Sequence, residues 1–287
     1  MLYPALLLLQ AAVAPPATDI YVAELRVADG RVVVGVPVNV TTRPGYDNQP
    51  NFLPNGRAFL YTSVREDSQA DIYRYDLDRL SSMRLTATRE SEYSPTPLPD
   101  GNGFSVVRVE ADSTQRLWAF DEDGTHPHLV LDSIRPVGYH AWAGAHTLVL
   151  FVLGTPPTLQ ITDTRTPSAR GEIVAQNIGR SLQRVPGSAA IAFLQRDSVA
   201  GNWIKQVNST TNDVIPLVRA LDGADFFTWM PRGIALAARD TKLYQWNPRR
   251  SQDWEEIVDF SAAGLTNVTR LAVNPKGDRL AIVAVPR

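Results

Sequence analysis

Short runs in which apolar and polar residues alternate recur along the chain, separated by turn residues, and they predict β-strands. The clearest block runs from Tyr46 to Thr86. Within it, Pro54-Asn55-Gly56 predicts a tight turn, and β-branched and aromatic residues predict strands over 57–63 and 71–76. With one short strand before the turn and another over 83–86, the block predicts a four-stranded sheet of about 40 residues.

The same block repeats along the rest of the chain. Its turn returns, intact or weakened, as Pro99-Asp100-Gly101, Ala143-Gly144, Pro186-Gly187, Pro231-Arg232-Gly233 and Pro275-Lys276-Gly277. Its third strand returns over 117–121, 159–163, 203–208 and 243–247, and each copy ends in Asp or Asn. One such sheet cannot bury both of its faces alone, so the repetition predicts sheets that pack against one another.

The two ends of the chain together supply one more copy. Residues 19–23 resemble a third strand and 38–41 a fourth, with a hairpin turn expected at Asp29-Gly30, while 269–285 supply a first and a second strand. We therefore expect an all-β fold, a six-bladed β-propeller with four-stranded blades whose ring is closed by strands from both termini. The propeller is expected to form a single domain over residues 18–287.

The first residues predict export from the cytoplasm. Residues 2–13 are largely apolar but too short to span a membrane, and Ala12-Val13-Ala14 matches an Ala-x-Ala cleavage site. A signal peptide over residues 1–14 and a periplasmic or secreted location follow as predictions. The segment lacks basic residues and Pro15 follows the site directly, which leaves a buried or disordered N-terminal segment as the alternative.

Composition narrows the classes of partner and chemistry. The net charge of −2 and the absence of Lys/Arg runs argue against binding to nucleic acid or to an anionic membrane. The chain has no cysteine, which excludes disulfides and thiol catalysis. We expect a monomer that does not span a membrane.

No recognised catalytic or metal-binding motif is present in the sequence. His126-Pro127-His128 could place two imidazoles on one strand face, and Asp121-Glu122-Asp123-Gly124 superficially resembles the start of a calcium loop, but turn chemistry accounts for both runs. We expect no catalytic residue, no resident metal and no cofactor.

The pattern Pro-x-x-x-Pro-(Asp/Asn)-Gly, then an apolar strand, then Asp-Ile-Tyr and Arg-Leu-Thr resembles the WD40-like (PD40) repeat of TolB-type six-bladed propellers. The residues that carry the resemblance best are Pro50, Pro54, Asn55, Gly56, Asp71, Ile72, Tyr73, Arg84, Leu85 and Thr86, then Pro95, Pro99, Asp100 and Gly101. TolB itself has a further N-terminal α/β domain, for which this sequence leaves no room. The resemblance implies a binding module of the bacterial envelope, with a protein or peptide held at the channel face.

Candidate binding residues come from the loops that lead into each first strand, since these loops surround the channel mouth of a propeller. Counting back from each turn gives Tyr46, Asp47, Glu92, Tyr93, Arg180 and Asp225. Tyrosine is common at binding surfaces because it offers apolar area and a hydrogen bond at low entropic cost. Three alternatives stay open: a channel lined only by turn residues, a small-ligand sensor, and a calcium-dependent, lactonase-like hydrolase that would use Asp47, Glu92 and Asp225.

Overall fold

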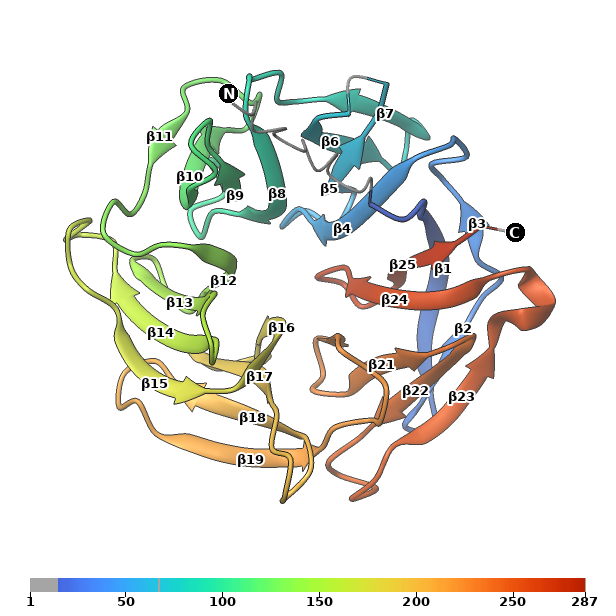
Figure 1. The fold of residues 1–287 in the computed structure, drawn as a ribbon. Helices are drawn as coiled ribbons and strands as arrows, with labels where there is room; N and C mark the ends of the chain where they lie inside the picture. The colour runs from blue at the N-terminus through green and yellow to red at the C-terminus, as the bar shows by residue number, and fades with distance from the viewer. Residues whose placement is uncertain (1–14, 67, 287) are drawn as a thin grey trace, which may run out of the picture.

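The computed structural model describes residues 15–66 and 68–286, so the signal peptide expected over 1–14 lies outside the described residues. In this part of the chain six sheets stand around a central axis like the blades of a propeller (Figure 1). The helical content of these described residues is a single 3-10 turn, η1 (Phe260–Ala263). The expected all-β, six-bladed propeller is therefore confirmed.

Blades 1 to 5 follow the chain in order, and each runs from an innermost strand at the channel to an outermost strand at the rim. Blade 1 contains β4 (Tyr46–Phe52), β5 (Ala58–Val64), β6 (Ala70–Asp76) and β7 (Ser81–Arg84). Blade 2 contains β8 (Ser91–Pro97), β9 (Gly103–Val109), β10 (Gln115–Asp121) and β11 (His128–Leu129). Blade 3 contains β12 (Val137–Trp142), β13 (Thr147–Val152), β14 (Thr158–Asp163) and β15 (Glu172–Gln176). Blade 4 contains β16 (Ile178–Arg184), β17 (Ala190–Gln195), β18 (Trp203–Asn208) and β19 (Val214–Arg219). Blade 5 contains β20 (Phe227–Trp229), β21 (Ala235–Arg239), β22 (Lys242–Trp246) and β23 (Glu255–Asp259).

Blade 6 joins the two ends of the chain, as the sequence predicts. Its inner strands are β24 (Thr266–Val273) and β25 (Arg279–Val285), and β25 pairs antiparallel with β1 (Asp19–Ala28), placing Tyr21 opposite Ile282. β3 (Val38–Asn39) pairs with the first half of β1 and supplies the expected fourth strand. The ring therefore closes through backbone hydrogen bonds between the termini, which removes two exposed sheet edges.

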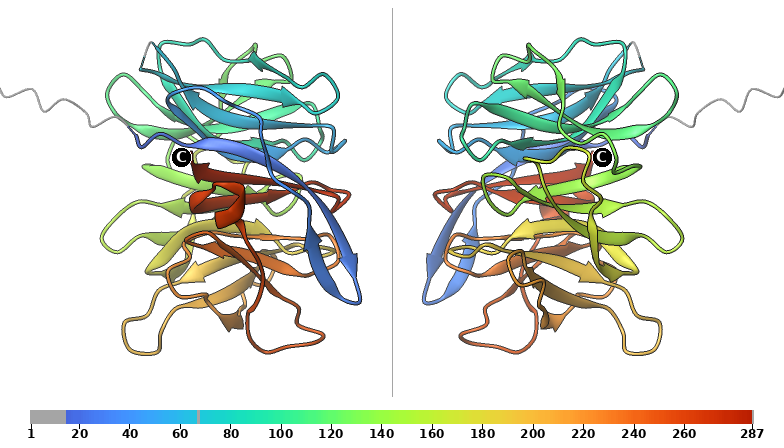
Figure 2. Two further views of the ribbon diagram at one scale, coloured as in Figure 1. Left: turned by 90° about the vertical axis from the view of Figure 1, so that its right-hand side faces the viewer. Right: turned by 90° about the vertical axis from the view of Figure 1, so that its left-hand side faces the viewer.

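The second half of β1 extends past its own blade. It turns at Asp29-Gly30 into β2 (Arg31–Val34), and this hairpin lies along the side of blade 5 (Figure 2). The amide N–H of Val32 donates to the Gln245 side chain at 2.7 Å, and Asn247 donates to the carbonyl of Gly30 at 3.2 Å. The N-terminal strand thus binds two blades at once.

The recurring sequence signals have the structural roles expected of them. The turn glycines Gly56, Gly101, Gly187, Gly233 and Gly277 all have φ between 69° and 82°, a region that side chains with a Cβ rarely enter. At the end of third strands, Asp76, Asp163, Asn208 and Asn247 each accept a hydrogen bond from the backbone N–H two residues later. The side chain therefore starts the turn, which explains why Asp or Asn recurs there.

Apolar side chains from both faces of each sheet fill the spaces between blades. The described residues form six buried hydrophobic clusters, and each lies between two neighbouring blades. Between blades 1 and 2, for example, Leu60 and Ile72 pack against Phe104, Val106 and Phe120. Every blade thus buries both faces, and no blade has a complete core of its own.

A buried histidine connects blades 2 and 3 beside the channel. Nε2 of His140 lies 2.7 Å from the Ser105 hydroxyl, which also accepts a hydrogen bond from the Trp142 indole at 2.9 Å. Burial lowers the pKa of His140 to about 3 from an ordinary value of 6.5. The folded protein therefore holds this imidazole neutral over a pH range in which the unfolded chain protonates it.

This difference predicts acid sensitivity. As pH falls from 6.5 towards 3, the unfolded state binds a proton that the folded state does not, so stability is lost. The substitution His140→Gln keeps a hydrogen-bonding group but removes the imidazole that takes up the proton. In denaturant unfolding we expect the stability difference between pH 7 and pH 4.5 to shrink by roughly 2–3 kcal/mol in this variant. The exposed His128→Gln is the control; an unchanged pH dependence in His140→Gln would contradict the assignment.

Candidate functional site

Six side chains, one from each blade, meet at the end of the channel where the first strands begin. We call this set the mouth ring: Tyr46, Tyr93, Tyr139, Arg180, Phe226 and Arg270. Each residue lies within the first five positions of its innermost strand or one residue before it. Five of these strands carry a β-bulge close to the same place, which re-aims side chains where regular pairing is interrupted.

Arg270 is fixed by aromatic neighbours rather than by a carboxylate. Its guanidinium carbon lies 3.8 Å from the centre of the Phe226 ring and 5.2 Å from that of Tyr139. It also donates a hydrogen bond to the Tyr139 hydroxyl at 2.8 Å. These contacts join blades 3, 5 and 6 across the mouth and leave the positive charge unneutralised.

The pKa of Tyr46 shows that this side chain lies close to four other ring members. Burial raises its pKa to about 12, the charges of Arg270 and Arg180 oppose the rise, and Tyr139 and Tyr93 add to it. Burial also raises the pKa of Tyr93. Both hydroxyls therefore stay protonated at neutral pH and can donate hydrogen bonds.

Inside the mouth ring the channel is narrow, and it widens beyond. The narrow part is a cavity of about 90 Å³ whose lining includes Tyr139, Arg180, Phe226 and Arg270. Past His140 the channel opens into a space of about 640 Å³, lined in part by Trp142, Trp229 and the proline-containing turns. A side chain can enter the narrow part, whereas a folded segment would stop at the ring.

Three of the six residues predicted from the sequence lie in the mouth ring. Tyr46, Tyr93 and Arg180 are ring members, as counting back from the turns indicated. Tyr139, Phe226 and Arg270 were missed, although each lies next to or just inside the beginning of its innermost strand. The missing signal was the bulge, because the register shift that it introduces is not the same in all blades.

Asp47 and Glu92 were expected to be exposed at the mouth, and the structure corrects this. Both are 0% exposed. Asp47 accepts from Arg43 at 2.6 Å, and Glu92 accepts from Arg108 at 3.1 Å and from Thr88 at 2.5 Å. Asp47 follows the ring member Tyr46, and Glu92 precedes the ring member Tyr93. Because neighbouring side chains of a strand point to opposite faces, both carboxylates point away from the mouth and into the interior. They support the strands from within and do not reach solvent.

Asp225, the remaining predicted residue, lies beside the ring member Phe226. It is exposed and forms an ion pair with Arg196 at 2.5 Å. Its charge is therefore already matched at the surface. The three carboxylates proposed for a calcium-dependent enzyme thus each contact a different arginine.

The side chains of the histidine and aspartate runs at the rim form local turn contacts. His126 is exposed and contacts Asp121 at 2.7 Å, while Asp123 accepts from Thr125. In the part of the chain that the structure describes, no group of three or more His, Cys, Asp or Glu side chains is placed to hold a metal ion.

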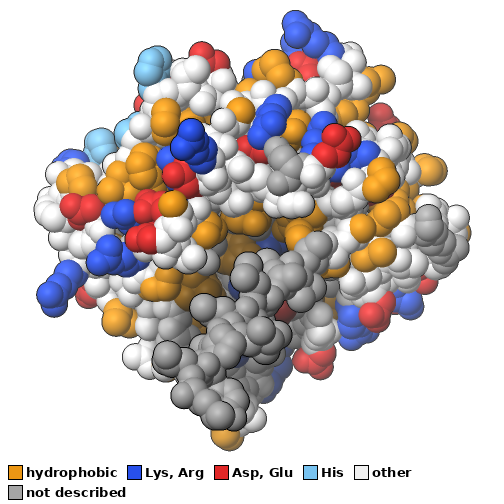
Figure 3. All heavy atoms as spheres, turned by 45° about the horizontal axis from the view of Figure 1, so that its top comes forward, with side chains coloured by type: hydrophobic (Ala, Val, Ile, Leu, Met, Phe, Trp, Pro, Cys, Tyr) orange, Lys and Arg blue, Asp and Glu red, His pale blue; other side chains and the backbone are white. Residues whose placement is uncertain are grey.

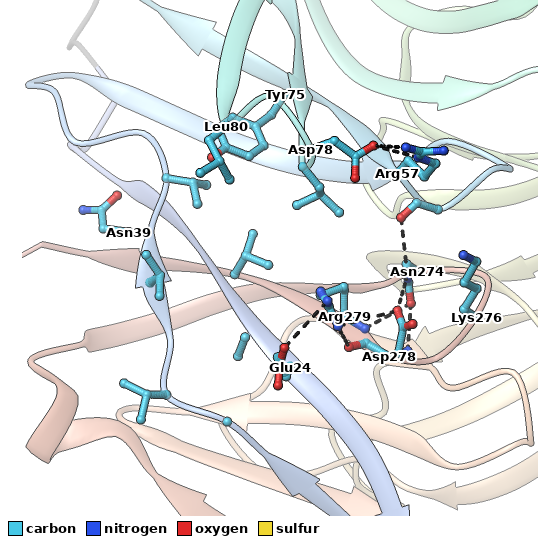
Figure 4. A pocket seen from close by; sticks show the side chains of 18 of the residues that line it. Glu24, Asn39, Arg57, Tyr75, Asp78, Leu80, Asn274, Lys276, Asp278 and Arg279 are labelled. Atoms are coloured by element: carbon cyan, nitrogen blue, oxygen red, sulfur yellow. Dashed lines mark hydrogen bonds and ion pairs between the residues drawn. The ribbon is translucent and has the colours of Figure 1, made fainter.

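A more voluminous hollow than either part of the channel lies outside it. It is a groove of about 960 Å³ between blades 1 and 6, formed because β3 has only two residues and β2 diverges towards blade 5 (Figure 4). Its polar side chains largely pair with one another, Arg57 with Asp78 and Arg279 with Glu24. Its apolar lining includes the exposed Val36, Val38 and Leu80.

Charge on the visible surface is mixed. Lys/Arg and Asp/Glu side chains are interspersed over the face shown in Figure 3, without a broad area of one sign. Within the described residues no helix is long and apolar enough to cross a membrane.

The buried pair behind the ring gives a stability prediction. Burial raises the pKa of Glu92, while the hydrogen bond from Thr88 and the charge of Arg108 oppose the rise. Glu92→Gln would leave the Arg108 charge buried without its carboxylate, so we expect a loss of about 3–5 kcal/mol in urea unfolding. The double variant Glu92→Gln/Arg108→Met should recover most of this loss. A single variant within about 0.5 kcal/mol of the wild type would contradict the pairing.

Comparison with known proteins supports the fold, although no family model matches the sequence. The chain is similar to a structure assigned as TolB from Agrobacterium tumefaciens, with a TM-score of 0.71 and 15% identity over 93% of this chain and 98% of that one. It is also similar to TolB from Acinetobacter baumannii, with a TM-score of 0.59 and 14% identity over 93% of this chain and 64% of that one.

An enzyme shares the architecture as well. A gluconolactonase from Xanthomonas campestris has a TM-score of 0.64 and 9% identity over 95% of this chain and 98% of that one. Identities this low carry the fold and not the activity. The six blades and these similarities together confirm the expected fold: the chain is a TolB-like six-bladed β-propeller.

Proposed function

We propose that the protein is a non-catalytic binding module that holds a protein or peptide partner at the mouth ring. The observation that carries the proposal is the composition of the ring: three tyrosines, one phenylalanine and two arginines, one residue from each blade. Aromatic residues and arginine are the residue types that dominate binding energy at protein interfaces.

The rigidity of the ring supports the same function. Its members project from the innermost strands or the residues next to them, and Arg270 is already held against Phe226 and Tyr139. A partner would therefore meet a preorganised surface and lose little free energy in ordering it. Arg180 is exposed and makes no hydrogen bond or ion pair to any described residue, so it is free to contact a partner.

The proposed setting is the periplasm or the extracellular space, with the propeller of residues 18–287 acting as a monomer after removal of residues 1–14. The apolar segment over 2–13 with its Ala-x-Ala site supports export. The resemblance of the repeat to that of TolB-type propellers supports a role as an envelope protein that binds other envelope proteins. Closure of the ring supports a monomer, since the chain pairs the strand edges of its own termini.

A crosslinking pull-down from the envelope fraction tests the binding site. Arg180→Glu reverses an exposed ring charge without touching the core, and Arg232→Glu makes the same change at an exposed turn on the opposite side of the propeller. We expect a partner enriched by the wild type and by Arg232→Glu, with at least about tenfold less recovered by Arg180→Glu.

Equal recovery by Arg180→Glu and Arg232→Glu would show that the ring is not the contact surface. A buried variant such as Asp47→Arg would not give this information, because its unpaired charge would destabilise the fold.

The hydrolase alternative predicts a bound calcium ion, whereas its three candidate carboxylates, Asp47, Glu92 and Asp225, each contact an arginine. We therefore expect the melting temperature of the protein to change by less than about 1 °C between a chelator and excess calcium. Stabilisation by several degrees, with stoichiometric metal in the purified protein, would favour the hydrolase and contradict the binding-module proposal.

A further inference from the structure

The narrow cavity inside the mouth ring has a distinctive lining. It contains both ring arginines and no Asp or Glu among its described lining residues. The chain as a whole carries a net charge of −2, so this concentration of positive charge runs against the overall balance. His140 lines the deeper part and, held neutral by burial, adds no charge.

The hydrogen-bonding groups that remain available near the ring are mainly donors. The side-chain oxygen of Gln49 already accepts from Thr62 at 2.8 Å and from the Ser94 amide at 2.7 Å. This leaves its NH₂ group without a partner among the described residues. The Ser94 hydroxyl is buried and also has no partner in the described part of the chain.

Arginine and tyrosine add further donors. Arg180 has no polar partner among the described residues, and Arg270 uses one N–H on the Tyr139 oxygen. Since that oxygen accepts from Arg270, the Tyr139 proton stays available for donation. Donors from blades 1, 2, 3, 4 and 6 thus converge on a space of about 90 Å³ that already carries two positive charges.

We infer that this cavity is an anion site, and that it takes a single carboxylate presented by the partner. The inference rests on the proposed function, because the carboxylate belongs to the bound segment. A carboxylate accepts several hydrogen bonds and pairs well with guanidinium groups, so it matches the free donors. Phe226 and the ring tyrosines surround the entrance and would pack against the apolar part of the same segment.

Two sources of the carboxylate are consistent with this chemistry, an acidic side chain and the C-terminus of the partner. Three matched tripeptides separate them: acetyl-Gly-Gln-Phe amide as the neutral reference, acetyl-Gly-Glu-Phe amide, and acetyl-Gly-Gln-Phe with a free carboxylate. Binding is followed through the Nε–Hε signals of Arg180 and Arg270 in protein labelled with ¹⁵N-arginine. Arg180→Lys and Arg270→Lys assign the two signals.

We expect at least one acidic peptide to shift both signals saturably and to bind about tenfold or more tightly than the neutral peptide, at constant ionic strength. The tighter of the two identifies the source of the carboxylate. Arg180→Gln should weaken its binding, read from Arg270, by about tenfold, whereas Arg232→Gln should leave it unchanged. Ser94→Ala tests the buried hydroxyl and should weaken binding by a smaller factor, about threefold.

Equal affinity for the acidic and neutral peptides, or no shift at Arg180 and Arg270 with any of them, would overturn the inference. The outcome is separate from that of the pull-down. A ring-dependent partner without carboxylate preference would leave the proposed function standing and remove the anion site. Carboxylate binding without a ring-dependent protein partner would leave the anion site standing and contradict the proposed function.

Discussion

The structure depends on one constraint, the burial of both faces of every blade. A four-stranded sheet with apolar side chains on both faces is unstable alone, and the six clusters between neighbouring blades meet this need only if the ring is complete. The pairing of β1 with β25 is therefore as important as any cluster, since it supplies the third strand of the last blade. Rotational repetition of the blades then brings the beginnings of all six innermost strands to one end of the channel, and the mouth ring is a direct result.

The mouth ring and the buried carboxylates behind it differ in chemistry, although their residues are neighbours in the sequence. In blades 1 and 2 a tyrosine of the ring stands next to a buried carboxylate, Tyr46 beside Asp47 and Tyr93 beside Glu92. The carboxylates bind buried or half-buried arginines behind the strands, while the ring arginines Arg180 and Arg270 bind no carboxylate of the described residues. Negative charge is thereby kept out of the mouth, and the ring is left with a positive charge that a partner can use.

The sequence predicted the architecture because its signals are local. A turn glycine with positive φ and an Asp that starts a turn act within a few residues, so their repetition reveals the blades, including the shared one. The site was only half predicted because it depends on register. The bulges in the first strands decide which neighbour faces the channel, and no local pattern separates Tyr93 from Glu92 in that respect. Arg270 was missed since its aromatic partners come from blades 3 and 5, far away in the sequence.

The hairpin of β1 and β2 has a consequence for how the chain folds. These are among the first residues of the described chain to be synthesised, yet one half of β1 pairs with β25 and the hairpin lies on blade 5, so its partners emerge last. During synthesis β1 can pair with β2 and β3, but β25 and blade 5 are not yet available to it, while blades 1 to 4 can already stack in order. The N-terminal strand therefore completes the molecule rather than starting it, and until then it is the segment most exposed to pairing with other chains.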